Sequence, residues 1–272
     1  MTKFFLILSW LSSSGTSRVR QLELYGRANV RASKRISNPG CYATSTQLLI
    51  APLLPYLAPP AWPTVFGVSG YSGAGTVIQA GEAGARPVSL PKVTPESLGG
   101  GIRPYSLTDH IHEREAGWHL SKLLPAPTDL PTAPTSKPRV QLAFIPTVAP
   151  FFSGILSTLS FPLSTSTLSA SDIASLYASY YTGERLVRTQ KGVPALGDVQ
   201  GQHGWVVGGI QVHSGLERVV VVGGLDNLLK GAATQCLQVR SRASFSLAPS
   251  FFGGGDCADD AIGTEFELGA WV

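Results

Sequence analysis

The stretch Ser37–Thr44, with the sequence SNPGCYAT, is the strongest structural signal in the chain. Pro39 and Gly40 predict a sharp turn, and Cys41 opens a run of small and apolar residues that extends to Leu54. Ser, Asn and Gly before such a run mark the start of a helix. We therefore expect Cys41 in the first turn of a buried helix.

This expected position favours a reactive Cys41. The first turn of a helix carries unpaired backbone N–H groups and the positive end of the helix dipole, and both stabilise a thiolate. A thiolate is a good nucleophile, and the same N–H groups suit a developing oxyanion. The alternative is a buried structural cysteine, which is common for a free thiol.

Composition limits the class of protein. The 272 residues suffice for one large domain or two modest ones, and only 14% of them are charged, below the usual quarter. The formal net charge of +4 comes without a Lys/Arg run, so nucleic acid is not implied, whereas an anionic substrate or cofactor is compatible. The three cysteines are far apart, which argues against a disulfide scaffold and for a reducing compartment.

No segment predicts a membrane span. The apolar residues 1–11 are too short to cross a bilayer, and we interpret them as a remnant strand or an artefact of where the chain begins rather than as a signal peptide. Residues 12–35 are polar and basic and predict a solvated connector. From Val239 the chain is rich in Ser, Phe and Gly without periodicity, which predicts a poorly ordered tail.

The middle of the chain predicts a fold that contains a sheet. Thr64–Val68 reads as a strand, followed by the glycine cluster Ser69–Gly75, which predicts a loop where backbone approaches a ligand closely. Residues 76–101 predict an irregular excursion, and 121–138 a Pro/Thr loop. Further strands are predicted at Arg139–Pro146 and Ile155–Phe161, a helix at Asp172–Tyr181 with Ser171 as its cap, a hairpin from Gly204–Val212 and Arg218–Val222, and a final helix capped by Asp226.

Tyr105–Glu115 concentrates polar side chains. On a strand His110 and His112 would share a face, whereas on a helix His112 and Glu115 would. A His-x-His pair also suggests a metal, but the cysteines lack zinc-ligand spacing and two His with one Glu match a metal site only loosely. A solvated surface cluster is the remaining alternative.

Taken together, these stretches resemble the N-acetyl-γ-glutamyl-phosphate reductases of arginine biosynthesis. The matching segments are Asn38–Thr44, Gly67–Gly75, His110–Glu115, Phe144–Pro146 with Pro150 and Gly154–Leu156, and Asp226–Ala233. The resemblance covers about residues 25–238. The sequence of Pro104–Glu115 is similar to that of the fungal members of the family, in which the reductase is the C-terminal part of a mitochondrial precursor. The resemblance implies a mitochondrial matrix location, or otherwise a cytoplasmic one.

The resemblance implies a fold and a chemistry. The fold would be α/β, more closely an α+β catalytic and dimerisation domain with a mixed sheet, like that of semialdehyde dehydrogenases. Cys41 would attack an acyl phosphate, N-acetylglutamyl 5-phosphate, and NADPH would reduce the resulting thioester to the semialdehyde. Cys41 and His110 match catalytic positions. The implied substrate-binding residues are Asn38, Tyr105, His112 and Glu115, and the implied cofactor-binding residues are Ser72, Gly73 and Asn227. From the residues alone, Asn227 is equally well a second cap beside Asp226.

The chain also departs from the family. Its members begin with a Rossmann half, whereas only forty residues precede Cys41 here and none forms a Gly-rich turn. We therefore expect 1–40 to be a remnant of the cofactor domain, 41–225 the catalytic and dimerisation domain, 226–238 a helix returning to the cofactor side, and 239–272 a divergent tail.

Three hypotheses follow. The first is a reductase that forms a homo-oligomer and that is either active or inactive as this chain. The second is a non-catalytic dimerisation fragment that binds a full-length partner. The third is a thiol hydrolase that uses Cys41 and His110, which the absence of the papain-type sequence around the cysteine disfavours. No metal, nucleic acid or membrane partner is expected.

Overall fold

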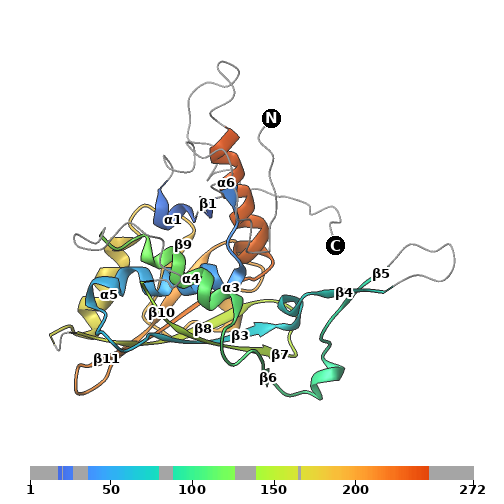
Figure 1. Ribbon diagram of the computed structural model, residues 1–272, viewed down its shortest axis with the longest axis horizontal. Coiled ribbons are helices and arrows are strands. Elements are labelled where there is room, and N and C mark those ends of the chain that lie inside the picture. The colour runs from blue at the N-terminus through green and yellow to red at the C-terminus, as the bar shows by residue number, and fades with distance from the viewer. Residues whose placement is uncertain are drawn as a thin grey trace.

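The structure is a computed structural model, and it describes residues 18–19, 21–26, 36–79, 88–125, 139–164 and 167–244. A seven-stranded mixed sheet forms its base (Figure 1). The strands, in spatial order, are β6 (Arg103–Pro104), β7 (Ala143–Ala149), β3 (Thr64–Gly70), β8 (Ile155–Pro162), β11 (Arg218–Leu225), β10 (Trp205–Val212) and β9 (Val187–Thr189). This sheet confirms the predicted α+β class.

The central strands explain the mixed character of the sheet. β3 pairs in parallel with β7 and antiparallel with β8. β11 runs antiparallel to both of its neighbours, β8 and β10, and β9 joins β10 in parallel at the edge. The predicted hairpin around residues 213–217 is confirmed, since Val212 pairs with Val219.

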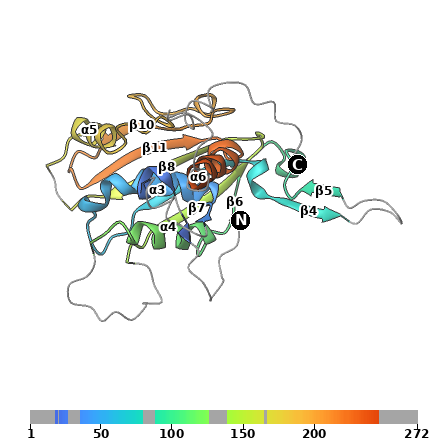
Figure 2. The ribbon, with the colours of Figure 1, turned by 90° about the horizontal axis from the view of Figure 1, so that it is seen from above.

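The longer helices lie on one face of this sheet (Figures 1 and 2). They are α3 (Cys41–Ile50), α4 (Ile111–Ser121), α5 (Ala170–Tyr180) and α6 (Thr234–Ser244). A 3₁₀ turn, Ala51–Tyr56, continues α3 past Pro52, and a π-helical turn, Leu229–Ala233, precedes α6. A short helix, α1 (Leu22–Tyr25), and a two-stranded pair, β1 (Arg18–Val19) and β2 (Ile36–Ser37), lie on the same side.

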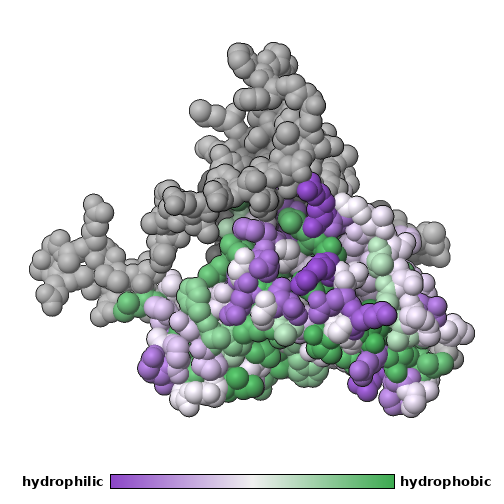
Figure 3. Space-filling model, turned by 180° about the vertical axis from the view of Figure 1, so that it is seen from behind, coloured by the Kyte–Doolittle hydropathy of each residue, from purple (hydrophilic) through white to green (hydrophobic). Residues whose placement is uncertain are grey.

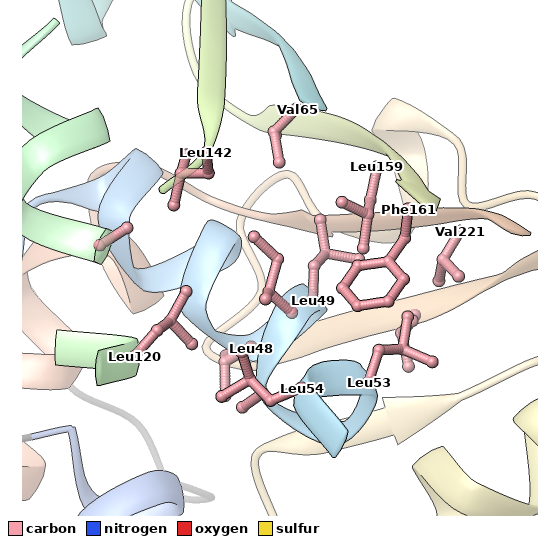
Figure 4. Packing of buried hydrophobic residues seen from close by; sticks show 14 of the residues in the cluster. Leu48, Leu49, Leu53, Leu54, Val65, Leu120, Leu142, Leu159, Phe161 and Val221 are labelled. Carbon is pink, nitrogen blue, oxygen red and sulfur yellow. The ribbon is translucent and has the colours of Figure 1, made fainter. Parts of the chain in front are cut away.

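The core lies between α3 and the sheet (Figure 4). Leu48, Leu49 and Leu53 are fully buried there, against Leu159 and Phe161 of β8. Each such side chain removes enough apolar surface from water to contribute about 1.5–3 kcal/mol to folding. Because every residue of α3 after Cys41 is buried, this helix is the central element of the domain and fixes the position of its first residue.

In the part of the chain that the structure describes, no α-helix covers the opposite face of the sheet, and this face is called the uncovered face below. Along β8 buried and half-buried residues alternate, as expected when one face packs on helices and the other does not. Phe66, on the central strand β3, is 48% exposed on this second face. Apolar patches also appear in green along the lower part of the molecule in Figure 3. Such a surface on a central strand is typical of an interaction face.

Four details differ from the sequence-based predictions. Residues 76–101 contain a hairpin rather than an irregular excursion, β4 (Thr76–Gln79) with β5 (Val88–Pro91), which projects from the body (Figure 1). The cap of α5 is Ser169, which forms a capping box with Asp172, so the prediction of Ser171 was wrong.

The other two differences concern the ends of the chain. Gln21 and Glu23, predicted in a solvated connector, are buried, because α1 packs against polar side chains of the C-terminal region. The helix α6 extends to Ser244, beyond the predicted end of order at Val239. Most of the predicted tail, the apolar residues 1–11 and the loop 126–138 lie outside the described residues. Within the described residues no helix is both long and apolar enough to cross a membrane.

Candidate active site

Cys41 is the first residue of α3, as the sequence predicts. Gly40, in extended conformation (φ −66°, ψ 159°), is the N-cap residue, and its carbonyl accepts the first helical hydrogen bond, from the Thr44 N–H at 2.8 Å. The Cys41 side chain is half-buried. The backbone therefore presents the thiol at a helix N-terminus, where donors for an oxyanion are available.

The expected low pKa of Cys41 does not follow from this position. Burial raises the pKa of the thiol to about 11, and the negative charge of Glu115 adds to the increase. The backbone N–H groups of Tyr42 and of Cys41 itself lower the pKa, but by less than burial raises it. At neutral pH the resting group is thus the thiol, and a nucleophilic role needs a base.

His110 is the N-cap residue of α4. Its Nδ1 accepts a hydrogen bond from the backbone N–H of His112 at 3.2 Å. The turn before it is unusual, since Ser106 and Asp109 both have positive φ, 43° and 59°. Non-glycine residues in this region cluster at functional sites. Because α4 begins at Ile111, the helical alternative for Tyr105–Glu115 is the correct one.

On this helix His112 and Glu115 form a pair. The Nδ1 of His112 lies 2.9 Å from Oε2 of Glu115, and the two side chains are 18% and 15% exposed. The other carboxylate oxygen, Oε1, accepts a hydrogen bond from the Gly40 N–H at 3.2 Å. The pair is thus bound directly to the residue that precedes Cys41.

Gly40 permits this approach because it has no side chain. A Cβ on Gly40 would lie 2.1 Å from Cε1 of His112, which is impossible without displacing the ring. Gly67 similarly makes room for the ring of Tyr42, whose Cε1 would be 2.3 Å from an added Cβ. Because its φ of −66° suits any residue, the glycine of the NPGC turn is required by the histidine ring and not by the backbone conformation.

Aromatic rings enclose His110. Its ring centroid lies 5.8 Å from that of Tyr105 and 5.2 Å from that of Phe144. Burial, reinforced by the neighbouring His112, lowers the pKa of His110 to about 4, although Glu115 opposes the change. Burial also raises the pKa of Tyr105 to about 12. Both side chains are therefore neutral at pH 7.

Asn38 connects the turn before Cys41 to the π-helical turn before α6. Its Nδ2 donates to the carbonyl oxygen of Ala232 at 3.3 Å, and its Oδ1 is buried with no hydrogen-bond partner among the described residues. Ala232 belongs to the π-helical turn, in which a Cβ on Gly231 would lie 2.6 Å from the Cβ of Cys41. Such turns are frequent at functional sites.

The sequence analysis missed this turn and the buried ion pair that holds it. Nζ of Lys230 lies 2.5 Å from Oε1 of Glu23, and both side chains have no exposed surface. Gln235 and Gln238 supply two more acceptors, at 2.5 and 2.6 Å. The sequence carries no local signal for this pair, because its two partners are 207 residues apart.

The predicted cofactor residues form a second group. Nδ2 of Asn227 donates to the Ser72 hydroxyl at 2.9 Å, and its Oδ1 accepts from the Gly154 N–H at 2.7 Å. A Cβ on Gly73 would lie 3.5 Å from Nδ2 of Asn227. Asp226, rather than Asn227, caps the following turn, with Oδ1 accepting from the N–H groups of Leu228 and Leu229.

The described residues contain no group of three or more His, Cys, Asp or Glu side chains suited to a metal ion. The structure thus brings together Cys41, Tyr105, His110, His112 and Glu115 through contacts with one another or with shared neighbours, and Ser72, Gly73 and Asn227 as a separate group. This arrangement can support nucleophilic attack by sulfur with proton transfer by imidazole.

Known proteins resemble this chain over most of its length. It is 42% identical over 212 residues to an N-acetyl-gamma-glutamyl-phosphate reductase of Xanthomonas axonopodis pv. citri, covering 78% of this chain and 57% of that protein. It is 43% identical over 216 residues to a mitochondrial protein of Candida albicans, covering 79% of this chain and 22% of that protein. The chain thus spans only part of the relatives that it matches.

Solved structures and a family model agree on the fold. Aspartate semialdehyde dehydrogenase II of Vibrio cholerae superposes with a TM-score of 0.56 at 16% identity, covering 82% of this chain and 67% of that one. The family model for the semialdehyde dehydrogenase dimerisation domain matches residues 41–227, from the cysteine at the start of α3 to the asparagine after β11. The chain therefore belongs to the semialdehyde dehydrogenase dimerisation-domain family.

Proposed function

We propose that this chain is the catalytic and dimerisation part of an N-acetyl-γ-glutamyl-phosphate reductase. The reaction is the NADPH-dependent reduction of N-acetylglutamyl 5-phosphate to N-acetylglutamate 5-semialdehyde in arginine biosynthesis, with release of phosphate. The observation that carries the proposal is Cys41 at the N-terminus of α3, with the His112–Glu115 pair hydrogen-bonded to the preceding residue. The names of the bacterial relatives support the choice of substrate.

The proposed chemistry uses Cys41 as the nucleophile. Its sulfur attacks the acyl carbon and expels phosphate, which leaves a thioester on the enzyme. The backbone N–H groups at the start of α3 stabilise the oxyanion that forms during attack. His110 and His112 supply the proton transfers, and Asn38 and Tyr105 contact the substrate.

The residues present fit the nicotinamide end of a dinucleotide. Because Gly73 has no side chain, its backbone packs against Ser69 and Asn227; an added Cβ would lie 2.5 Å from Oγ of Ser69. One of the two Nδ2 protons of Asn227 is not used by Ser72. Ser72, Gly73 and Asn227 would hold this end of NADPH, which supplies the hydride when bound. No Gly-rich turn of the dinucleotide-binding type precedes Cys41 in the sequence, so the chain alone should bind NADPH weakly.

A pre-steady-state assay tests this proposal. The purified chain, mixed with N-acetylglutamyl 5-phosphate and NADPH, should release a burst of at most one phosphate per Cys41 while NADPH absorbance stays constant. Cys41→Ser should abolish the burst, and Cys236→Ser should leave it unchanged. The absence of any burst from the folded chain would reject the proposed activity, and steady NADPH consumption would reject the predicted weakness of the cofactor site.

We further propose that the uncovered face of the sheet joins two copies of the chain. Phe66 is exposed on this face, and its register partners Ile145 and Thr158 lie beside it. Val68 extends the same apolar row along β3. Burial of such a row between two sheets suits a homodimer, and the family description names dimerisation. Phe66→Asp should give monomers in light scattering after size exclusion, whereas Ile102→Asp, away from β3, should not.

The second candidate, a non-catalytic dimerisation fragment, rests on this same face. It predicts that the chain co-elutes with a full-length reductase but shows no phosphate burst. A mitochondrial matrix location is proposed from the fungal relatives, whose names state that they are mitochondrial; a cytoplasmic location is the alternative.

A further inference from the structure

The carboxylate of Asp226 binds three separate parts of the chain, although the residue is only 2% exposed. Its Oδ1 accepts hydrogen bonds from the N–H groups of Leu228 and Leu229, at 2.8 and 3.2 Å. Its Oδ2 accepts from the Ser153 hydroxyl and from the Gly201 N–H, both at 2.9 Å. Three of these four partners are backbone N–H groups, which only donate, so both oxygens of the side chain must accept.

The next residue forms a second link between the same segments. Oδ1 of Asn227 accepts from the Gly154 N–H at 2.7 Å, and Gly154 follows Ser153 directly. Two consecutive side chains, Asp226 and Asn227, thus bind two consecutive residues of the turn between β7 and β8. The double link fixes the amide of Asn227 and leaves its Nδ2 to donate to Ser72.

The main chain of Asp226 leads into the π-helical turn that packs on Cys41. The carbonyl oxygen of Asp226 accepts the N–H of Gly231, five residues further on, at 2.9 Å. Gly231 lies directly against the cysteine, because a Cβ there would be 2.6 Å from Cβ and 3.2 Å from Cα of Cys41. Asp226 is therefore connected both to the Asn227 amide and to the backbone that covers one side of Cys41.

We propose, on the basis of the reductase function above, that Asp226 is a positioning residue: it holds the amide of Asn227 and the main chain at Gly231 as one rigid unit, and so fixes where a nicotinamide bound at Asn227 lies relative to the sulfur of Cys41. Reacting atoms must be held within about 3–3.5 Å of each other, and a misplacement of about 1 Å can cost 10²-fold in rate. Asp226 contacts neither reacting group and acts only through the residues that do.

The variant Asp226→Asn separates this role from that of a simple cap. An amide keeps one accepting oxygen for the N–H groups of Leu228 and Leu229, but it turns an NH₂ group toward Ser153 and Gly201. The hydroxyl can rotate to accept, whereas the Gly201 N–H loses its acceptor. The side chain keeps its size, so the variant breaks the connection between segments without opening a cavity.

Loosening of this unit should be visible at Cys41. Burial raises the pKa of the Cys41 thiol to about 11, and the main chain of Gly231 is part of what buries it. If Gly231 moves away, water reaches the sulfur and the pKa falls toward its ordinary value. The negative charge of Glu115, which also raises the pKa, is unaffected by the variant.

Alkylation by iodoacetamide between pH 7 and 10 tests the proposal without substrate or cofactor. At pH 8 Cys41 should be alkylated about tenfold faster in Asp226→Asn than in the wild type, which corresponds to a thiol pKa lower by about one unit. Ser153→Ala removes one of the four donors and should give a smaller change in the same direction. Asp172→Asn, which alters the capping box of α5, is the matched control and should leave the pH profile unchanged. Cys236, read from the same peptide map, should keep its rate.

Hydrogen–deuterium exchange measures the other half of the unit. The Gly154 N–H, which Asn227 accepts, should lose protection in Asp226→Asn, and the strand β8 that follows it should not. An unchanged pH profile of Cys41, or unchanged protection of Gly154, overturns the proposal, because the turn is then held by other contacts such as the Lys230 pair.

The phosphate burst keeps this proposal apart from the proposed function. A wild-type burst together with an unchanged Cys41 profile in Asp226→Asn rejects the role of Asp226 and leaves the reductase function standing. No burst in the wild type, with a shifted profile in the variant, rejects the substrate and leaves the connection between Asp226 and Cys41 standing. Circular dichroism confirms that each variant is folded, and Ser153→Ala replaces Asp226→Asn if the latter is not.

Discussion

Two glutamates of this chain each bind one basic side chain, and their surroundings are opposite. Glu23 and Lys230 have no exposed surface and are 207 residues apart in sequence, whereas Glu115 and His112 retain 15% and 18% exposure and lie three residues apart on one helix. Burial alone would raise the pKa of Glu23, but Lys230, with added hydrogen bonds, lowers it below its ordinary value. The first pair joins distant segments, and the second orients a ring. A glutamate paired with a basic side chain thus serves structure in one place and, under the proposed function, proton transfer in the other.

The largest effect should come from breaking the buried pair. Lys230→Met leaves the Glu23 carboxylate buried without its cation, so the free energy of unfolding should fall by about 3–5 kcal/mol. Urea denaturation followed by circular dichroism measures this loss. The double variant Lys230→Met with Glu23→Met should recover part of the stability, because no buried charge remains. A loss below about 1 kcal/mol in the single variant would contradict the comparison.

The site pair should respond in activity rather than in stability. Glu115→Gln removes the negative charge and one of the two accepting oxygens, so the side chain can no longer accept from both His112 and the Gly40 N–H. Under the proposed function, the rate of the phosphate burst should fall about 10²-fold. The free energy of unfolding should change by no more than about 1 kcal/mol, because a partly exposed pair contributes little. Rapid-quench kinetics and urea denaturation give the two values. Glu113→Gln, on the same helix, is the matched control and should retain the burst.

The two regions should lose their contributions to the free energy of unfolding in different pH ranges. The folded pKa of His110 is about 4, below its ordinary value near 6.5, so the unfolded chain binds more protons between these values and stability falls as pH drops from 6.5 to 4. Glu23 also has a lowered folded pKa; its contribution is complete above about 4.5 and disappears as pH falls through the folded value. The urea midpoint should be measured from pH 7 to pH 3. The decrease in the midpoint between pH 6.5 and 4 should disappear in His110→Asn and remain in Glu23→Gln.

Much of the site was predictable because its signals are local. The turn before Cys41, the helix that it opens, and the spacing of His112 and Glu115 all lie within short stretches of sequence. The hairpin of β10 and β11 is local in the same way. The raised pKa of Cys41 was not predictable, because it depends on how many other segments bury the thiol.

The remaining features depend on contacts between distant segments. Gly231 contacts Cys41 although the two residues are far apart in sequence, and Lys230 binds Glu23 in α1. No pattern in either segment specifies the other, and a polar connector gives no sign that Glu23 will be buried. The hairpin of β4 and β5 was missed for a different reason, since its two strands of four residues are too short to show a period.

The glycines around Cys41 have a consequence for how this protein can diversify. Gly40 and Gly231 bring main chain against His112 and Cys41, and Gly67 brings it against the ring of Tyr42, the neighbour of Cys41. Saturation mutagenesis should therefore find almost no tolerated replacement at these three positions. A surface formed by backbone atoms cannot be reshaped by replacing single side chains. Under the proposed function, a change of acyl substrate would instead have to act through side chains, such as the ring of Tyr105. Cys41 and the backbone next to it would stay unchanged, while the side chains around them change.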